Sequence, residues 1–322
     1  MPKVYITNTI PHVGVKMLKA HGFDVDMNSS NKPISKPELK DVLSTYYAVL
    51  SYIPDKIDEE IIKSAGQGLK IISNFAVGFD NIDVLSAKRH GIVVCNTPGV
   101  ANQAVAEHVF ALILSVAKNI LNADRFVRMG KFKNWDGNLF VSPELWGKSI
   151  GIVGMGRIGT FVASIAYGGF RMKVLYHDIV RSEDLEMLTE AKFCTLEHLL
   201  KESDVVSLHV PLLPTTRHLI SKEEFRLMKE TAILVNTARG PIVDEKALIE
   251  ALKEGQIAGA GLDVFEHEPH IPHELTTLGN AILTPHIGSA TLECREEMAT
   301  IAAQNIIDVF DGKTPFGLVK VS

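Results

Sequence analysis

The sequence predicts an α/β protein of two domains, each built on a doubly wound parallel sheet. Short apolar runs alternate with amphipathic stretches along the chain, a pattern typical of parallel strands joined by crossover helices. The alternation is interrupted at residues 96–99 (NTPG), and a second series of the same kind begins near residue 149. A length of 322 residues also favours two domains, because one domain usually takes about 100–200 residues.

The apolar periodicity resolves both series into individual elements. In the first series we expect strands at 4–7, 23–27, 48–52, 70–74 and 92–95, and helices at 13–21, 36–43, 58–65 and 83–90. A long helix is expected at 102–129. The second series predicts strands at 149–153, 173–177, 205–209, 232–236, 258–262 and 281–283, and a last helix at 290–310.

The composition excludes several classes of protein. Apolar residues make up 46% and charged residues 22%, which argues against a disordered or low-complexity chain. A net charge of −5 argues against a generally basic nucleic-acid binder. The three cysteines have no spacing that suggests a metal site, and they indicate a reducing compartment. With no signal-peptide pattern at the start and no apolar run long enough to span a bilayer, we expect a cytoplasmic protein without a membrane partner.

A glycine-rich loop follows the expected strand at 149–153. Gly154, Gly156 and Gly159 form a GxGxxG motif that opens a helical stretch. In a Rossmann domain the first glycine allows a tight turn, the second lets the backbone approach a pyrophosphate, and the third lets helix pack on strand. A turn that only packs tightly is the alternative, and the full strand–loop–helix context favours dinucleotide binding.

Asp178 ends the next expected strand, about 20 residues after the last glycine, where a carboxylate binds the adenosine-ribose hydroxyls. A carboxylate at this place repels a 2′-phosphate, so the sequence predicts NAD (NADH) as cofactor and makes NADP the less favoured alternative. Arg181 lies close by and leaves that alternative open.

Three chemically active residues follow three expected strands of the second series. Arg239 comes after 232–236, Glu268 after 258–262, and His286 after 281–283. Because ligands bind outside the carboxyl ends of parallel strands, all three should border the cofactor. Arg239 can bind a carboxylate or carbonyl oxygen, and His286 can donate a proton near neutral pH. Glu268 would favour the charged imidazolium and determine its tautomer. Reduction of a 2-keto acid needs this set of groups.

Each of these residues also has a purely structural interpretation. His286 could cap a strand end, Glu268 could be a solvated loop acid, and Arg239 could bind only the sheet edge. Their joint placement after three strands favours a functional site.

Six segments resemble the D-isomer-specific 2-hydroxyacid dehydrogenases, and the glyoxylate/hydroxypyruvate reductase branch in particular. They are 75–81 (FAVGFDN), 96–100 (NTPGV), 152–159 (IVGMGRIG), 236–240 (NTARG), 261–269 (GLDVFEHEP) and 284–290 (TPHIGSA). The segments occur in order and cover nearly the whole chain. The resemblance implies an NAD-dependent enzyme that interconverts a small 2-keto acid and the D-2-hydroxy acid, without naming the substrate.

The resemblance also assigns roles to individual residues. The catalytic residues would be Arg239, Glu268 and His286. The substrate would contact Tyr52, Val77, Gly78, Arg239 and His286, with the backbone N–H groups of Val77 and Gly78 on its carboxylate. The cofactor would contact Gly154, Gly156, Arg157, Ile158, Gly159, Asp178, Val210, Pro211, Thr216, Thr237, Ala238, Arg239, Asp263, His286 and Gly288.

The family resemblance further implies a discontinuous domain arrangement and a homodimer. Residues 1–98 and 290–322 would form a flavodoxin-like substrate-binding domain, and residues 99–289 the Rossmann NAD-binding domain. The dimerisation segment would be 101–146, which has an apolar helical face too large to leave exposed, with packing of that face inside the monomer as the alternative. Trp135 in this segment could reach the partner's active site or serve only as an interface anchor.

Two other functions share this fold. A formate or phosphite dehydrogenase is one, although formate enzymes carry Gln where this chain has Glu268. An NAD-sensing corepressor, which can retain the same three residues, is the other. Turnover of a 2-keto acid would distinguish the enzyme from the corepressor.

Overall fold

The computed structural model describes residues 1–30 and 32–320, and the chain forms two compact units. Unit 1 comprises Met1–Ala101 and Ala290–Ser322, and unit 2 comprises Asn102–Ser289. The chain leaves unit 1 after Ala101, whereas the sequence placed this boundary after residue 98. It returns to unit 1 at Ala290.

Unit 1 contains a five-stranded parallel sheet with the strand order β2-β1-β3-β4-β5. The strands are β1 (Lys3–Ile6), β2 (Asp24–Met27), β3 (Ala48–Ser51), β4 (Ile71–Asn74) and β5 (Val93–Cys95). This is the flavodoxin-like order, and the expected doubly wound sheet is confirmed. β3 and β4 are buried throughout, which is typical of central strands covered on both faces.

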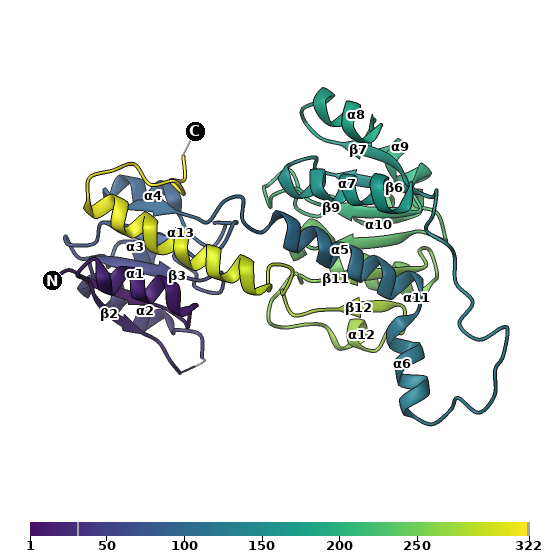
Figure 1. Cartoon of the computed structure of the whole chain (residues 1–322), viewed down its shortest axis with the longest axis horizontal. Coiled ribbons are helices and arrows are strands. Elements are labelled where there is room, and N and C mark those ends of the chain that lie inside the picture. The colour runs from purple at the N-terminus through teal and green to yellow at the C-terminus, as the bar shows by residue number, and fades with distance from the viewer. Residues whose placement is uncertain (31, 321–322) are drawn as a thin grey trace. The chain divides into compact units, whose positions relative to one another are not determined.

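Helices cover this sheet, and the last of them comes from the far end of the chain. They are α1 (His12–Ala20), α2 (Lys36–Thr45), α3 (Glu59–Ile62), α4 (Val84–Arg89) and α13 (Leu292–Phe310). α13 packs beside α1, as Figure 1 shows for the yellow helix, and it also packs against β4. The Ser73 hydroxyl of β4 donates to the Ala302 carbonyl oxygen at 3.0 Å, so α13 is part of the core of unit 1.

Local sequence signals determine where several of these helices begin and end. Ser35 and Glu38 form a reciprocal capping box at the start of α2, and Asp58 and Asp83 cap α3 and α4. At the other end of α1 and α4 lie Gly22 and Gly91, with φ values of +89° and +73°. Glycine adopts this left-handed conformation without steric cost, so these two positions suit the ends of the helices.

Unit 2 contains a seven-stranded parallel sheet with the order β12-β11-β10-β9-β6-β7-β8. The strands are β6 (Ser149–Val153), β7 (Lys173–His177), β8 (Lys192–Phe193), β9 (Val205–Leu208), β10 (Ile233–Asn236), β11 (Gly259–Leu262) and β12 (Ala281–Leu283). The chain winds outward from β6 in one direction and then from β9 in the other. The switch point of this Rossmann order therefore lies between β6 and β9.

Helices cover both faces of the unit 2 sheet. The helices of the whole unit are α5 (Asn102–Ala117), α6 (Ile120–Arg128), α7 (Arg157–Phe170), α8 (Glu183–Thr189), α9 (Leu196–Glu202), α10 (Lys222–Leu227), the 3-10 helix η1 (Gly240–Ile242), α11 (Glu245–Lys253) and α12 (His273–Thr276), of which α6 has no buried residue. α5 and α7 enclose one apolar core with the sheet, and α9, α10 and α11 enclose a second core on the opposite face. Successive strand residues alternate between the cores, as Ile233 and Leu234 do.

The prediction of one continuous helix at 102–129 is wrong. Two helices, α5 and α6, occupy this stretch and are bent by 61° relative to each other. Asn119, between them, has a φ of +53°, a left-handed conformation that asparagine tolerates better than most residues. The apolar pattern continues across the break, which is why periodicity alone did not reveal it.

No single helix in the described part of the chain is long and apolar enough to span a membrane. Taken together, the bent pair α5 and α6 has the length and the apolar composition of a span, but no other feature of the described residues supports one. Half of the residues in α5 are buried in the core of unit 2, which accounts for its apolar character.

Candidate active site

The candidate cofactor residues follow the carboxyl ends of six parallel strands of unit 2. Gly154 follows β6, Asp178 follows β7, Val210 comes after β9, Thr237 follows β10, Asp263 follows β11, and His286 comes after β12. Because every strand pair in this sheet is parallel, these ends share one edge of the sheet. Unit 2 therefore brings the predicted cofactor residues to the place where α/β sheets bind ligands.

The glycine loop between β6 and α7 has the geometry that a pyrophosphate needs. A Cβ atom on Gly154, whose φ is +96°, would lie 2.8 Å from the His209 carbonyl carbon. A Cβ atom on Gly159 would lie 2.3 Å from the Gly154 carbonyl oxygen, so helix and loop can pack only without side chains here. A Cβ atom on Gly156 would meet no atom within 4 Å. The second glycine thus leaves open space beside the N-terminus of α7, as a bound pyrophosphate requires.

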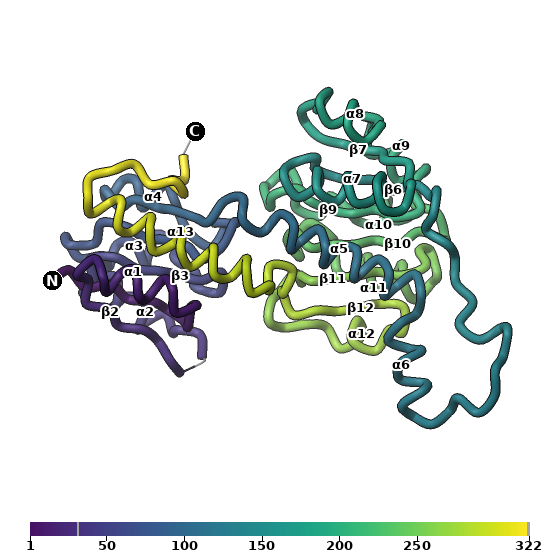
Figure 2. Tube along the Cα trace, in the orientation of Figure 1, coloured from purple at the N-terminus to yellow at the C-terminus, as the bar shows by residue number. Residues whose placement is uncertain are grey.

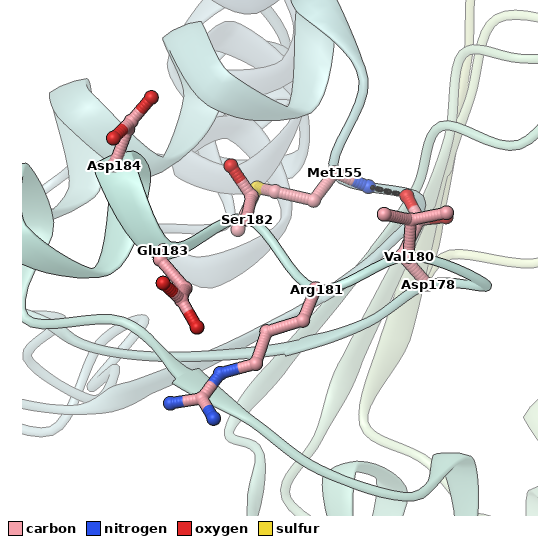
Figure 3. Close-up of a pocket in the computed structure, with 7 residues that line it drawn as sticks. All are labelled: Met155, Asp178, Val180, Arg181, Ser182, Glu183 and Asp184. Atoms are coloured by element: carbon pink, nitrogen blue, oxygen red, sulfur yellow. Dashed lines mark hydrogen bonds between the residues drawn. The ribbon is translucent and has the colours of Figure 1, made fainter.

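Asp178 is connected directly to this loop. Its Oδ2 accepts a hydrogen bond from the Met155 backbone N–H at 2.6 Å, and its Oδ1 accepts one from the Ile179 N–H at 2.6 Å. Arg157 and Ile158 form the first turn of α7, where helix N–H groups have no partner within the helix. Figure 3 shows the bond between Met155 and Asp178.

A pocket opens beside Asp178, lined by residues of the loop after β7 and the start of α8. Its lining residues are Met155, Asp178, Val180, Arg181, Ser182, Glu183 and Asp184. Four of these side chains are charged, and only Arg181 is basic. In Figure 3 the Arg181 side chain extends away from the Asp178 carboxylate.

The loop after β9 is closed by one of its own side chains. The Thr216 hydroxyl donates to the Pro211 carbonyl oxygen at 2.6 Å and accepts from the Leu213 N–H at 2.8 Å. The structure therefore places Val210, Pro211 and Thr216 in one closed turn at the edge of the sheet.

The Asn236 side chain holds the loop after β10, which carries Arg239, by two hydrogen bonds. This side chain is 1% exposed; its Nδ2 donates to the Arg239 carbonyl oxygen at 2.9 Å and its Oδ1 accepts from the Ala238 N–H at 3.0 Å. Gly240 must be glycine, because a Cβ atom there would lie 1.9 Å from the Phe265 carbonyl carbon. The buried Thr237 hydroxyl has no hydrogen-bond partner within the described residues. An unpaired buried hydroxyl at this edge suits a bound ligand that can complete it.

Glu268 and His286 form a hydrogen-bonded pair. His286 Nδ1 lies 2.9 Å from Glu268 Oε2, and Glu268 Oε1 accepts the Phe265 N–H at 2.9 Å. A carboxylate only accepts hydrogen bonds, so Nδ1 carries the proton in this pair and Nε2 remains for chemistry. The two side chains are 26% and 33% exposed, which leaves them accessible to a ligand.

Asp263 positions the loop that carries His286. Its carboxylate is buried, and His286 itself donates its backbone N–H to the Asp263 carbonyl oxygen at 2.9 Å with a φ of +56°. The carboxylate accepts hydrogen bonds from the Thr284 hydroxyl at 2.6 Å, the Ile287 N–H at 2.9 Å and the Gly288 N–H at 2.7 Å. Asp263 was predicted as a cofactor residue, and its contacts in this structure are to the loop between β12 and the end of unit 2.

His108 completes this arrangement and was missed by the sequence analysis. Its Nε2 lies 2.9 Å from the Thr284 hydroxyl and 3.3 Å from Asp263 Oδ1. Burial raises the pKa of Asp263, but the hydrogen bonds from His108, Thr284 and two backbone N–H groups outweigh it and hold the pKa below its usual range. A histidine within the apolar pattern of α5 was the one signal in the sequence. Its partner, Asp263, is 155 residues away in sequence, so the local pattern could not identify the pair.

Unit 1 holds the predicted substrate residues Tyr52, Val77 and Gly78. The carbonyl oxygens of Val77 and Gly78 accept hydrogen bonds from Asn96 Nδ2 at 2.7 Å and Asn74 Nδ2 at 2.9 Å. Within residues 1–30 and 32–320, the N–H groups of Val77 and Gly78 have no hydrogen-bond partner. Two adjacent unpaired N–H groups on a loop held by its carbonyls can bind a carboxylate.

Tyr52 belongs to a small aromatic cluster in unit 1. Its ring stacks on Phe75 with centroids 4.9 Å apart, its hydroxyl donates to the Thr9 carbonyl oxygen at 2.5 Å, and burial raises its pKa. Arg295, in the first turn of α13, places its guanidinium carbon 5.9 Å from the Phe75 ring centroid. Arg295 was not among the residues predicted from the sequence, although it follows the 284–290 segment closely.

Comparisons with known proteins identify the family of this chain. Residues 110–288 match the family described as D-isomer specific 2-hydroxyacid dehydrogenase, NAD binding domain. The glyoxylate reductase of Pyrococcus furiosus is 48% identical and is aligned over 99% of this chain and 95% of its own. The chain belongs to the D-isomer-specific 2-hydroxyacid dehydrogenase family.

Solved structures extend the comparison to the fold. The TT0316 protein of Thermus thermophilus has a TM-score of 0.93 and 40% identity, covering 99% of this chain and 100% of its own. A D-lactate dehydrogenase of Aquifex aeolicus, solved with NAD and lactic acid, has a TM-score of 0.83 and 31% identity, covering 96% of each chain. The predicted two-sheet fold, family and NAD cofactor are confirmed, and this protein is an oxidoreductase acting on keto acid and hydroxy acid pairs.

Replacing Asp263 by Asn tests the role of its charge in the folded state. We expect the free energy of unfolding at pH 7 to fall by about 1–3 kcal/mol, because a charged acceptor of several hydrogen bonds is lost. The folded pKa lies below the unfolded value of about 3.9, so the stabilisation is complete above that value and is lost as the pH falls through the folded pKa.

The measurement is urea unfolding of both proteins at several pH values from neutral to strongly acidic, reaching below the unfolded carboxyl pKa of about 3.9. The difference between wild type and Asp263→Asn should narrow as the pH falls. Ser73→Ala is the control, because it removes one buried hydrogen bond, to the Ala302 carbonyl oxygen, but touches no charged group, so its effect should not depend on pH. An equal difference at all pH values for Asp263→Asn would contradict the assignment.

Proposed function

We propose that this oxidoreductase reduces a small 2-keto acid of the glyoxylate or hydroxypyruvate type to the D-2-hydroxy acid, with NADH as cofactor. The hydrogen-bonded pair of Glu268 and His286 carries this proposal, because it presents a proton donor at the sheet edge that also bears the glycine loop. The 48% identity to a glyoxylate reductase over nearly the whole chain supports the choice of a small substrate.

The residues present fit a dinucleotide. Open space at Gly156 and the unpaired Thr237 hydroxyl are the observations that support this fit. We propose that the pyrophosphate binds at the N-terminus of α7 and that Asp178 binds the adenosine-ribose hydroxyls. The remaining cofactor contacts are assigned to Gly154, Arg157, Ile158, Gly159, Val210, Pro211, Thr216, Ala238, Arg239, Asp263, His286 and Gly288.

The chain's own residues provide the acid and the anion-binding groups of the reaction. A bound nicotinamide supplies the hydride. His286 donates the proton from Nε2 to the substrate carbonyl oxygen, where negative charge would otherwise develop. Glu268 holds the imidazole by Nδ1 and so orients Nε2 for the proton transfer. Arg239 binds the substrate carboxylate or carbonyl oxygen through its planar guanidinium.

In unit 1, the unpaired N–H groups of Val77 and Gly78 are proposed to bind the substrate carboxylate, and Tyr52 to border its side chain. The Tyr52 ring stacks on the buried Phe75, which holds it in place. Arg295 places its guanidinium carbon 5.9 Å from the Phe75 ring centroid and adds a positive charge there.

A panel of 2-keto acids tests the function. The wild-type protein should oxidise NADH in the presence of glyoxylate and hydroxypyruvate, with a larger kcat/KM than for longer 2-keto acids. Loss of NADH absorbance is the measurement. NADH binding without turnover of any 2-keto acid would favour the corepressor alternative, and reduction of NAD by formate or phosphite would favour the other enzyme class.

Removing the proposed acid tests the mechanism. His286→Ala should lower kcat by about 10²–10⁴, because a positioned general acid contributes that much, while NADH binding measured by fluorescence is retained. His270→Ala is the matched control, since His270 is an exposed histidine two residues beyond Glu268. Glu268→Gln should lower kcat without unfolding the protein. Full activity of His286→Ala would contradict the assignment.

We further propose that the protein is a homodimer joined through α6 and the loop that follows it. Figure 2 shows this segment extending beyond the α/β body of unit 2. It exposes a series of large apolar side chains, with Trp135 85% exposed. The others are Ile120, Leu121, Val127, Met129, Phe132, Val141 and Trp146. An apolar surface of this kind marks a contact between proteins.

Sedimentation equilibrium tests the dimer. The mass should be twice the chain mass of 35.3 kDa, and a Val127→Glu/Phe132→Glu double variant should sediment as a monomer. Leu85→Glu, which changes an exposed leucine of unit 1, should remain dimeric. Trp135→Ala distinguishes the two roles of that residue: a dimer with reduced kcat/KM indicates that Trp135 reaches the partner's active site. A monomeric wild type would contradict the proposal.

We also infer that the enzyme works in the cytoplasm. Its three cysteines, Cys95, Cys194 and Cys294, are free, and burial raises the pKa of each thiol, so they remain unreactive in a reducing compartment. Recovery of the protein from another cell fraction would contradict this placement.

A further inference from the structure

The pocket beside Asp178 is lined by one cationic side chain, to which a 2′-phosphate could bind. Arg181 lines this pocket together with Asp178, three residues before it in the loop after β7. A guanidinium in this position is the group that accommodates the additional phosphate of NADP in Rossmann domains. Whether the pocket accepts that phosphate therefore depends on what Arg181 binds.

Arg181 is held by Glu186, a residue of α8 outside the pocket lining. Arg181 Nε lies 2.9 Å from Glu186 Oε1, and Arg181 Nη2 lies 2.7 Å from Glu186 Oε2. This is the two-bond geometry in which a guanidinium binds a carboxylate most strongly. A phosphate would compete for these same two donors.

Glu186 is itself anchored to the sheet. The fully buried Tyr176 of β7 donates its hydroxyl to Glu186 Oε1 at 2.7 Å, and that hydroxyl accepts the Ser182 N–H at 2.9 Å. The Glu186 side chain is 17% exposed, whereas that of Arg181 is 58% exposed. Glu186 therefore has the fixed position, and Arg181 is the partner that could move.

The ion pair persists over the working pH range. Arg181 and then the Tyr176 hydroxyl hold the pKa of Glu186 at about 2, against the opposing effect of burial. Glu186 is therefore ionised at every pH at which the enzyme would act. If Arg181 turned to a phosphate, Glu186 would keep its charge beside a second anion and lose its partner, which disfavours that arrangement.

We propose that Glu186 is a specificity-determining residue for the cofactor, because it holds Arg181 and so denies a 2′-phosphate its cationic partner. This rests on the proposed placement of the adenosine ribose at Asp178. The two acids act differently: Asp178 binds the ribose hydroxyls and repels the phosphate directly, whereas Glu186 competes with the phosphate for Arg181. The effect of Glu186 must therefore depend on Arg181, and the effect of Asp178 need not.

A double-mutant cycle on equilibrium binding tests this without relying on turnover. The probes are NADPH and NADH, followed by nicotinamide fluorescence, and 2′,5′-ADP with 5′-ADP, followed by calorimetry. Glu186→Gln keeps an acceptor for the Tyr176 hydroxyl and should tighten NADPH and 2′,5′-ADP binding by about tenfold, since one charge-assisted pair becomes available. NADH and 5′-ADP binding should change little.

Two further variants make the outcome specific. Adding Arg181→Ala to Glu186→Gln should abolish the gain, while Arg181→Ala alone should weaken NADPH binding much less, because Arg181 is occupied in the wild type. Glu183→Gln is the matched control, because it removes one negative charge from the same pocket without releasing the two Arg181 donors, so it should not give the tenfold gain, and any smaller gain should survive Arg181→Ala. A tenfold Glu186→Gln gain that survives Arg181→Ala, or that Glu183→Gln reproduces, would overturn the proposal.

Asp178→Asn separates this inference from the placement on which it rests. If Asp178→Asn shifts the ratio of NADPH to NADH affinity and Glu186→Gln does not, the role of Glu186 is wrong and the ribose placement stands. If neither shifts the ratio, the adenosine ribose does not bind at Asp178, and both are wrong. Should Glu186→Gln fail to fold, the Arg181→Ala variant alone decides: a large loss of NADPH affinity would show that Glu186 does not occupy Arg181.

Discussion

A buried carboxylate at the end of β11 organises the loop that carries the proposed acid. Asp263 accepts hydrogen bonds from a hydroxyl and two backbone N–H groups of the loop after β12, and it does so with almost no exposure to solvent. A charge buried this deeply is tolerated only when its oxygens are fully hydrogen-bonded. The bonds in turn hold His286 at a φ of +56°, a conformation that a non-glycine residue keeps only when its surroundings impose it.

Hydrogen bonds and packing also connect His286 to the neighbouring loops at this edge of the unit 2 sheet. Glu268 binds the His286 ring while its second oxygen is held by the Phe265 N–H, and the carbonyl group of Phe265 closes over Gly240. Gly240 follows Arg239 directly, so the loop after β11 contacts both the loop after β10 and the loop after β12. The loop after β11 therefore connects the loop that carries Arg239 to the loop that carries His286.

Most strands could be predicted from the sequence because buried parallel strands are short apolar runs between turn residues. β8 could not, because it is two exposed residues at the sheet edge without an apolar pattern. The break between α5 and α6 was missed because no proline or glycine marks it, and Asn119 adopts the left-handed conformation in its place. His108 and Arg295 lacked a local signal, since each acquires its neighbours only when distant segments pack together.

The sequence by itself determined the family and the succession of two parallel-sheet series along the chain. It also determined which loops bear the glycine motif, Asp178, Arg239, Glu268 and His286. It could do so because parallel strands bring all their carboxyl ends to one edge, whatever the loops look like. Only the tertiary structure decided which atoms pair at that edge: His286 Nδ1 with Glu268, Asp263 with the loop after β12, and Arg181 with Glu186 rather than Asp178. A hydrogen bond forms only when its two atoms lie about 3 Å apart. The loop conformation and burial that bring such atoms together cannot be read from the order of the residues.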